Sequence, residues 1–190
     1  QSVKIPHKFI YSSFANRGLK QLLEMFPKIR QVYPDATLEV FSDTKHPWVQ
    51  KHHKKQADEI DEMLIKQAQY VTNHGWVKPD ILRRYWSISH VWLYPCIFPE
   101  TACLTAFEAA ASRTLVVTNN NAGLSESVGD RGLILYGDPS STEWQDQCIN
   151  MLKQVLDTAL EQELIRKNYE WVSTKDYQTV VKDFNEKYLC

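Results

Sequence analysis

The sequence predicts an α/β domain with three layers, in which a six-stranded parallel sheet lies between two layers of helices. Six short apolar segments alternate with longer segments whose apolar residues recur at helical spacing. Residues 114–118 read TLVVT, and β-branched residues of this kind are typical of a strand buried on both faces of a parallel sheet. With 190 residues, the chain is long enough for one domain with its own core.

Turn residues and apolar periodicity place the elements in order. We expect strands at 8–12, 37–42, 69–72, 90–95, 114–118 and 132–136. We expect helices at 16–33, 57–66, from 79, from near 102, at 142–172 and at 176–188. Pro34 and Asp35 form the turn before the second strand, Gly75 ends the third, and Pro79 begins a helix. Residues 43–56 are polar and are expected to be irregular.

The bulk composition excludes several classes of function. The formal net charge is −1 and the pI is near 6.7, so there is no electrostatic basis for binding nucleic acid. No apolar run approaches the ~20 residues needed for a transmembrane segment, and the N-terminus has no signal-peptide character. The four cysteines form no C-x-x-C pair, which favours reduced thiols and a cytoplasmic location. Because Gln1 is an unusual first residue, we expect the single domain at 1–190 to be part of a longer chain.

Several kinds of chemistry are not favoured by the sequence. His46, His52 and His53 have no carboxylate or cysteine at ligand spacing, and neighbouring lysines would oppose a bound cation, so no metal site is expected. No G-x-G-x-x-G follows the first strand, which argues against a dinucleotide oxidoreductase. For Cys103 as a nucleophile, the sequence places no base beside the thiol.

The stretch FPETACLTAFEAAA, after the fourth strand, carries the strongest candidate for a ligand site. If a helix begins near Ala102, then Glu108 lies about two turns into it and Glu100 lies in the loop before it. The amides of Ala102, Cys103 and Leu104 would be unpaired within the helix and available to phosphate. A phosphate site with a carboxylate on each side suits a sugar nucleotide. The alternative is a buried helix whose glutamates cap it or form ion pairs.

The turn between the first strand and the first helix, SSFANRGL, is a second candidate. In open α/β sheets, ligands bind at turns that follow the carboxyl ends of strands. Arg17 is able to hold a diphosphate with two N–H groups, and the hydroxyls of Ser12 and Ser13 are close in sequence. An exposed arginine at the start of a helix explains the same residues equally well.

Taken in order, these segments resemble the C-terminal, nucleotide-sugar-binding domain of retaining glycosyltransferases of the GT-B fold, above all family 4. The resemblance covers nearly the whole chain, through SSxxxRGL, HGWV, PETACLTAFEAAA, NNNAGL and GLILYGDP. It implies a Rossmann-like domain that forms one half of a GT-B fold. The family's usual GR…KG pattern is replaced here by Ser12, Ser13, Arg17 and Gly18, which leaves one certain cation.

The resemblance implies a role for each residue of the site. Glu100 would contact the transferred sugar, and Glu108 would bind the ribose hydroxyls. Gly75, Trp76 and Val77 would flank the base, with Trp76 either stacked on the base or part of the ordinary core. The expected catalytic residues are Glu100 and Arg17. The expected donor-binding residues are Ser12, Ser13, Arg17, Gly75, Trp76, Val77, Glu100, Thr101, Ala102, Cys103, Leu104, Thr105 and Glu108.

The implied function is transfer of a hexose or deoxyhexose from a UDP- or GDP-sugar to a hydroxyl of a glycan or other acceptor. No cofactor or metal is implied, and the chain contains no Asp-x-Asp motif. The groups expected to stabilise the leaving diphosphate are Arg17, Ser13, the amides around Cys103 and Leu104, and the Thr105 hydroxyl. Gly123 would let the donor approach the backbone. An N-terminal domain or a partner chain would bind the acceptor. The alternative is a non-catalytic module that binds the sugar nucleotide or serves as a scaffold.

Overall fold

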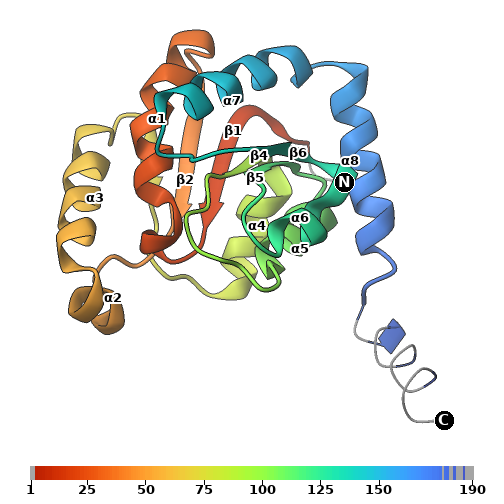
Figure 1. Cartoon of the computed structure of the whole chain (residues 1–190), viewed down its shortest axis with the longest axis horizontal. Helices are drawn as coiled ribbons and strands as arrows, with labels where there is room; N and C mark the ends of the chain where they lie inside the picture. The colour runs from red at the N-terminus through yellow and green to blue at the C-terminus, as the bar shows by residue number, and fades with distance from the viewer. Residues whose placement is uncertain (1–2, 177, 180–181, 183–185, 187–190) are drawn as a thin grey trace.

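A six-stranded parallel sheet lies at the centre of the molecule, as the sequence predicts (Figure 1). The structure is a computed structural model that describes residues 3–176, 178, 179, 182 and 186. The strand order is β3-β2-β1-β4-β5-β6, and each neighbouring pair is parallel. The strands are β1 (Ile5–Ser12), β2 (Thr37–Phe41), β3 (Val71–Asn73), β4 (Ser89–Tyr94), β5 (Leu115–Asn119) and β6 (Leu133–Leu135).

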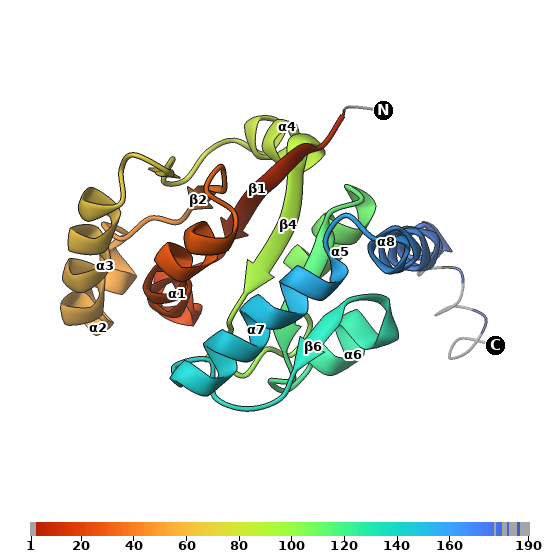
Figure 2. The same cartoon turned by 90° about the horizontal axis from the view of Figure 1, so that it is seen from above.

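Helices connect the strands and cover both faces of the sheet. They are α1 (Leu19–Val32), α2 (Pro47–His52), α3 (Lys54–Lys66), α4 (Pro79–Ile88), α5 (Leu104–Ala111), α6 (Leu124–Val128), α7 (Thr142–Val155) and α8 (Ala159–Val172), with 3-10 turns η1 (Ala15–Arg17) and η2 (Gly129–Arg131). α1 and α5 lie on opposite sides of β1 and β4 (Figure 2). Parallel connections are right-handed, and the chain leaves β1 toward β2 but leaves β4 toward β5. The helices of the two halves therefore lie on opposite faces.

Aromatic contacts join each layer of helices to the sheet. On one face, Phe9 of β1 meets Phe26 of α1 edge-to-face, with ring centroids 5.5 Å apart. On the other face, Phe41 of β2 meets Tyr85 of α4 with centroids 5.0 Å apart. β4 is buried along its whole length, as expected for a strand in the middle of a parallel sheet.

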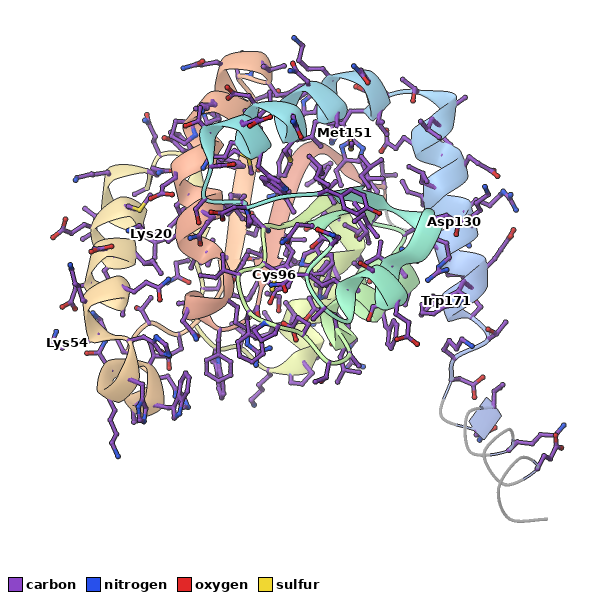
Figure 3. The ribbon with its side chains drawn as sticks, viewed as in Figure 1. Lys20, Lys54, Cys96, Asp130, Met151 and Trp171 are labelled. Carbon is purple, nitrogen blue, oxygen red and sulfur yellow. The ribbon has the colours of Figure 1, made fainter. Side chains whose placement is uncertain are left out.

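The helix expected at 142–172 is in fact two helices, α7 and α8. Asp157 has a φ of +62° between them, and the Thr158 side chain caps α8 by accepting the Glu161 amide. The turn redirects the chain, so that Trp171 of α8 contacts the Phe107 ring of α5 at 5.2 Å. Figure 3 shows Trp171 beside the segment that carries Asp130. None of the helices in the described part of the chain is long and apolar enough to cross a bilayer.

The expectation of irregular structure at 43–56 is wrong, because α2 and the start of α3 lie there. Pro47 occupies the first turn of α2, and Nδ1 of His46 accepts the Trp48 amide at 3.2 Å. The proline and this cap together begin a helix that composition alone does not indicate. The helix expected at 176–188 falls largely outside the described residues.

Gly18 ends the turn after β1 and sets the start of α1. Its φ is +142°, a conformation that residues with a side chain rarely adopt. A Cβ at this position would lie 2.3 Å from the Pro95 carbonyl oxygen. Beside it, the Ile97 amide donates to the Arg17 carbonyl at 3.1 Å. The turn after β1 and the loop after β4 are therefore in direct backbone contact, and α1 begins at Leu19 rather than at residue 16.

Substitution of Gly18 by alanine should destabilise the fold strongly. We expect Gly18→Ala to lower the free energy of unfolding by about 2–4 kcal/mol, because backbone strain and a steric clash with Pro95 add together. Gly75→Ala is the matched control: Gly75 also has a positive φ, of +63°, but an added Cβ would meet no atom within 4 Å. It should cost about 1 kcal/mol. Urea titration measures both values, and equal losses would contradict the close-contact argument.

Candidate functional site

The carboxyl ends of β1 and β4 meet at one edge of the sheet. These strands are neighbours, and the connections that leave them run in opposite directions along the sheet. In open α/β sheets, ligands bind at such a switch point because the two following loops diverge and leave a crevice. Here the turn after β1 carries Ser13 and Arg17, and the loop after β4 carries Glu100.

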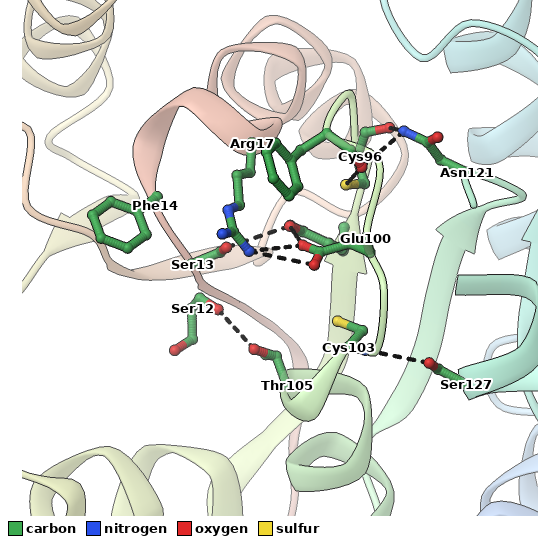
Figure 4. Close-up of polar contacts among 12 residues, drawn as sticks. Ser12, Ser13, Phe14, Arg17, Cys96, Glu100, Cys103, Thr105, Asn121 and Ser127 are labelled. Atoms are coloured by element: carbon green, nitrogen blue, oxygen red, sulfur yellow. Dashed lines mark hydrogen bonds and ion pairs between the residues drawn. The ribbon is translucent and has the colours of Figure 1, made fainter. Parts of the chain in front are cut away.

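Arg17 and Glu100 form an ion pair across this point (Figure 4). Nη1 of Arg17 donates to the two carboxylate oxygens at 3.0 and 3.3 Å. The Arg17 side chain is 29% exposed and that of Glu100 only 8%, so the guanidinium covers the carboxylate. Arg17 also lies over the Phe98 ring, 4.3 Å from its centroid. The structure thus brings the two expected catalytic residues together.

Tyr94, at the end of β4, is a member of this cluster that the sequence interpretation missed. Its hydroxyl donates to Oε1 of Glu100 at 2.7 Å and lies 3.3 Å from Oγ of Ser13. The side chain is almost fully buried. A tyrosine inside a strand buried on both faces needs a partner for its hydroxyl, and this requirement is the signal that could have revealed it.

The loop after β4 is held in place by the end of β5 and the segment that follows it. The Cys96 amide donates to Oδ1 of Asn119 at 2.8 Å, and Nδ2 of Asn119 donates back to the Cys96 carbonyl at 2.9 Å. Nδ2 of Asn121 donates to the Cys96 and Phe98 carbonyls at 3.2 and 2.9 Å. The asparagines of NNNAGL therefore shape the loop that presents Glu100.

Gly123 also helps to hold the loop that carries Glu100. Its amide donates to the Glu100 carbonyl at 2.7 Å, and a Cβ on Gly123 would lie 2.3 Å from the Thr101 carbonyl oxygen. From the sequence, we expected the donor to approach the backbone at Gly123. In the structure, the backbone of the Glu100 loop fills the space beside Gly123.

The start of α5 differs from the expected phosphate site. The helix begins at Leu104, and the Cys103 amide donates to Oγ of Ser127 at 3.3 Å, so it is not available to an anion. Ala102 precedes the helix. Of the first helical amides, those of Thr105 and Ala106 contact the Cys103 thiol, and that of Leu104 has no acceptor within the helix. The Leu104 amide is therefore the part of the expected phosphate site that could still face an anion.

Side chains around the start of α5 have mixed roles. The Thr105 hydroxyl donates to the Ser12 carbonyl at 3.3 Å and ties α5 to the end of β1 (Figure 4). Thr101 is exposed in the preceding loop, and Leu104 is 71% exposed at the first position of the helix. The expected contact of Thr105 with a diphosphate would therefore compete with a structural hydrogen bond.

A pocket of about 250 Å³ opens beside the ends of β1 and β2. It brings together five of the expected donor-binding residues from two distant segments. It is lined by Ser12, Ser13, Phe14, Phe41, Gly75, Trp76, Val77 and Leu82. Trp76 is 63% exposed, so the alternative that it belongs to the ordinary core is wrong. Its ring contacts that of Phe14 with centroids 5.8 Å apart.

Glu108 lies apart from this pocket, on the exposed side of α5. The atoms packed on one side of the carboxyl desolvate it and raise its pKa above the usual range, while the nearby Trp86 side chain acts in the opposite sense. Glu108 is thus a carboxylate at the surface in a partly dry environment, which is a suitable acceptor for sugar hydroxyls.

The structure also gives the surroundings of Cys103 and of the histidines, for which the sequence favours neither nucleophilic nor metal chemistry. Burial raises the pKa of the Cys103 thiol to about 12, so this thiol is protonated and inert at neutral pH. The rings of His52 and His53 pack against Trp48 at 5.2 and 5.1 Å. Within the described residues, no group of three histidine, cysteine or carboxylate side chains is placed to hold a metal ion.

Comparison of the sequence with known protein families identifies the family of this chain. Residues 7–154 match the sequence profile of the family described as glycosyl transferases group 1. A comparison with curated protein sequences found no match.

Several solved structures share this fold, and some of them are described as glycosyltransferases. One from Rickettsia africae ESF-5 superposes with a TM-score of 0.73 at 18% identity, over 98% of this chain and 48% of that one. HepE of Anabaena, solved with UDP and glucose, superposes with a TM-score of 0.75 at 16% identity, over 95% of this chain and 47% of that one. The pneumococcal O-GlcNAc transferase GtfA, solved with UDP and GlcNAc, superposes with a TM-score of 0.70 at 14% identity, over 96% of this chain and 35% of that one.

This chain therefore spans between 35% and 48% of the length of these solved proteins. The profile covers most of the chain, and the superpositions cover 95–98% of it. The chain belongs to the glycosyl transferases group 1 family and has the fold of one half of a GT-B glycosyltransferase.

Proposed function

We propose that this chain is the donor-binding half of a retaining glycosyltransferase that moves a sugar from a UDP- or GDP-sugar to a hydroxyl of a glycan or other acceptor. The observation that carries the proposal is the convergence at the switch point of the sheet. Arg17 and Glu100 face each other there, and Phe14 both lines the neighbouring pocket and lies 5.7 Å from the Arg17 guanidinium. Family membership and the UDP bound to two of the similar proteins support it.

In this proposal, the parts of the donor follow the edge of the sheet. The base enters the pocket beside Trp76 and Val77, where an exposed ring is able to stack on it. Glu108 accepts hydrogen bonds from the ribose hydroxyls. The diphosphate lies between Arg17 and the Leu104 amide at the start of α5, and the sugar reaches toward Glu100.

The chemical task of this half is to stabilise the leaving diphosphate. Negative charge grows on its oxygens as the bond to the sugar breaks, and a guanidinium with two free N–H groups is well suited to it. Arg17 is held by Glu100 until a diphosphate competes for it. When Arg17 turns to the diphosphate, the Glu100 carboxylate becomes available to sugar hydroxyls. One event thus prepares both residues, and a metal is not required for either.

A non-catalytic module that binds a sugar nucleotide is the second candidate. It is favoured by the burial of Glu100 beneath Arg17. In the leading proposal, the acceptor is bound by an N-terminal domain or a partner chain. Donor binding without turnover by the full-length protein would favour the second candidate.

The first test is binding of the donor. We expect calorimetry of the full-length protein to show saturable binding of UDP or GDP, but not ADP. Arg17→Ala should weaken it on the order of 10-fold or more, because a charged hydrogen bond is lost. Arg166→Ala is the matched control, since Arg166 is an exposed, ion-paired arginine on α8. Unchanged affinity in Arg17→Ala, or no binding by folded protein, would contradict the proposal.

The second test is the pH dependence of nucleotide affinity. The raised pKa of Glu108 means that its carboxyl takes up a proton at higher pH than an ordinary glutamate. Because the ionised form accepts both ribose hydroxyls, affinity should fall as the pH is lowered through that range. At neutral pH, Glu108→Gln should bind the nucleotide several-fold more weakly, by about 1 kcal/mol, because a charged hydrogen bond is lost. The affinity of this variant should no longer depend on pH in that range. Glu62→Ala, which removes an exposed carboxylate of α3, is the control and should change neither the affinity at neutral pH nor its pH dependence.

The third test separates the two glutamates. We expect Glu100→Gln to retain affinity for the bare nucleotide, because the variant releases Arg17 from its ion pair. Its turnover should fall on the order of 100-fold, as the sugar loses a charged partner. Isothermal titration with UDP or GDP and steady-state kinetics with the corresponding sugar nucleotide give the two values. Equal losses of binding in Glu100→Gln and Glu108→Gln would show that their roles are wrongly assigned.

A further inference from the structure

We propose that Tyr94 is a positioning residue, which holds the Glu100 carboxylate in place for the sugar of the donor after Arg17 has turned away. The inference rests on the proposed function and extends it to a residue outside the expected set. The Tyr94 hydroxyl is 2.7 Å from Oε1 of Glu100, and Arg17 contacts the same oxygen at 3.0 Å. Glu100 is thus held from two sides, by a neutral donor and by a cation.

The direction of the hydrogen bonds follows from the chemistry of the groups. An ionised carboxylate only accepts, so the Tyr94 hydroxyl donates to Glu100. Burial raises the pKa of the Tyr94 phenol, which keeps its proton available for this bond. The Ser13 hydroxyl, 3.3 Å away, must then donate to the Tyr94 oxygen. A directed chain runs from Ser13, which lines the pocket proposed for the base, through Tyr94 to Glu100.

The two partners of Glu100 differ in their freedom to move. The Tyr94 ring is 1% exposed, stacks on Trp92 with centroids 5.0 Å apart, and contacts Tyr11 at 5.8 Å. Such a ring has no other rotamer to adopt without opening the core. The Arg17 side chain is 29% exposed and lies at the mouth of the site. A diphosphate can therefore draw Arg17 away, while Tyr94 stays and keeps the carboxylate oriented.

The test is Tyr94→Phe in the full-length protein, with Tyr11→Phe as the matched control. Both variants keep a buried ring of the same ring pair and lose one buried hydroxyl, but the Tyr11 hydroxyl donates to the Phe14 carbonyl at 2.8 Å. Calorimetry compares UDP with UDP-glucose and UDP-N-acetylglucosamine, and GDP with GDP-mannose. Hydrolysis of the sugar nucleotide, which needs no acceptor, gives kcat and KM.

We expect Tyr94→Phe to bind the bare nucleotide within about twofold of the wild type and to lose kcat on the order of 10-fold. Its affinity for the sugar conjugate should fall to that for the bare nucleotide, whereas Tyr11→Phe should show no such separation. Unchanged kcat in Tyr94→Phe would overturn the inference, as would an equal loss for nucleotide and conjugate in both variants. No nucleotide binding by the wild type would overturn the proposed function, and this inference with it.

Discussion

The close approach of two backbone segments at the carboxyl edge of the sheet is the constraint on which the site depends. The turn after β1 touches the loop after β4 at Gly18 and Pro95, where there is no room for a side chain. Gly123 allows a second contact of this kind, with the Thr101 carbonyl. Since three loops meet through backbone atoms, small shifts in any of them would move the others. Arg17 and Glu100, 83 residues apart in sequence, are brought within hydrogen-bond distance by this contact.

On the proposed function, the ion pair between Arg17 and Glu100 serves ligand binding more than it serves the stability of the fold. Removing a carboxylate and a guanidinium from water costs nearly as much as their attraction returns, so such a pair adds little to folding. It does hold a cation and a carboxylate where an anionic ligand would have to bind. A diphosphate that displaces Glu100 from Arg17 exchanges one anion for another and leaves the arginine paired throughout. The Tyr94 hydroxyl then supplies the carboxylate with a hydrogen bond that remains.

The parallel sheet could be predicted from the sequence because each strand is a local run of apolar residues. The family could be predicted because its motifs occur in the same order along the chain. The features that were missed depend on contacts between distant segments. Oγ of Ser127 accepts the Cys103 amide that was expected to face a phosphate, and no pattern within residues 98–111 reveals this contact. In the same way, the space beside Gly123 is filled by a loop more than twenty residues earlier, and Tyr94 reads as one more apolar residue of its strand. The described structure leaves Glu108 as a separate carboxylate, and its role remains a prediction.

The exposure of the edge residues indicates what this half would need from the rest of an enzyme. Trp76 and Leu104 are largely exposed, and the pocket beside Trp76 is open to solvent. Charge on a leaving diphosphate is stabilised most effectively where water is excluded, since water weakens the attraction between Arg17 and the phosphate oxygens. On the proposed function, this domain selects and orients the donor, whereas exclusion of water comes from whatever covers the edge. A domain alone could then hold a sugar nucleotide well and still transfer the sugar slowly, so that binding and turnover need not rise or fall together.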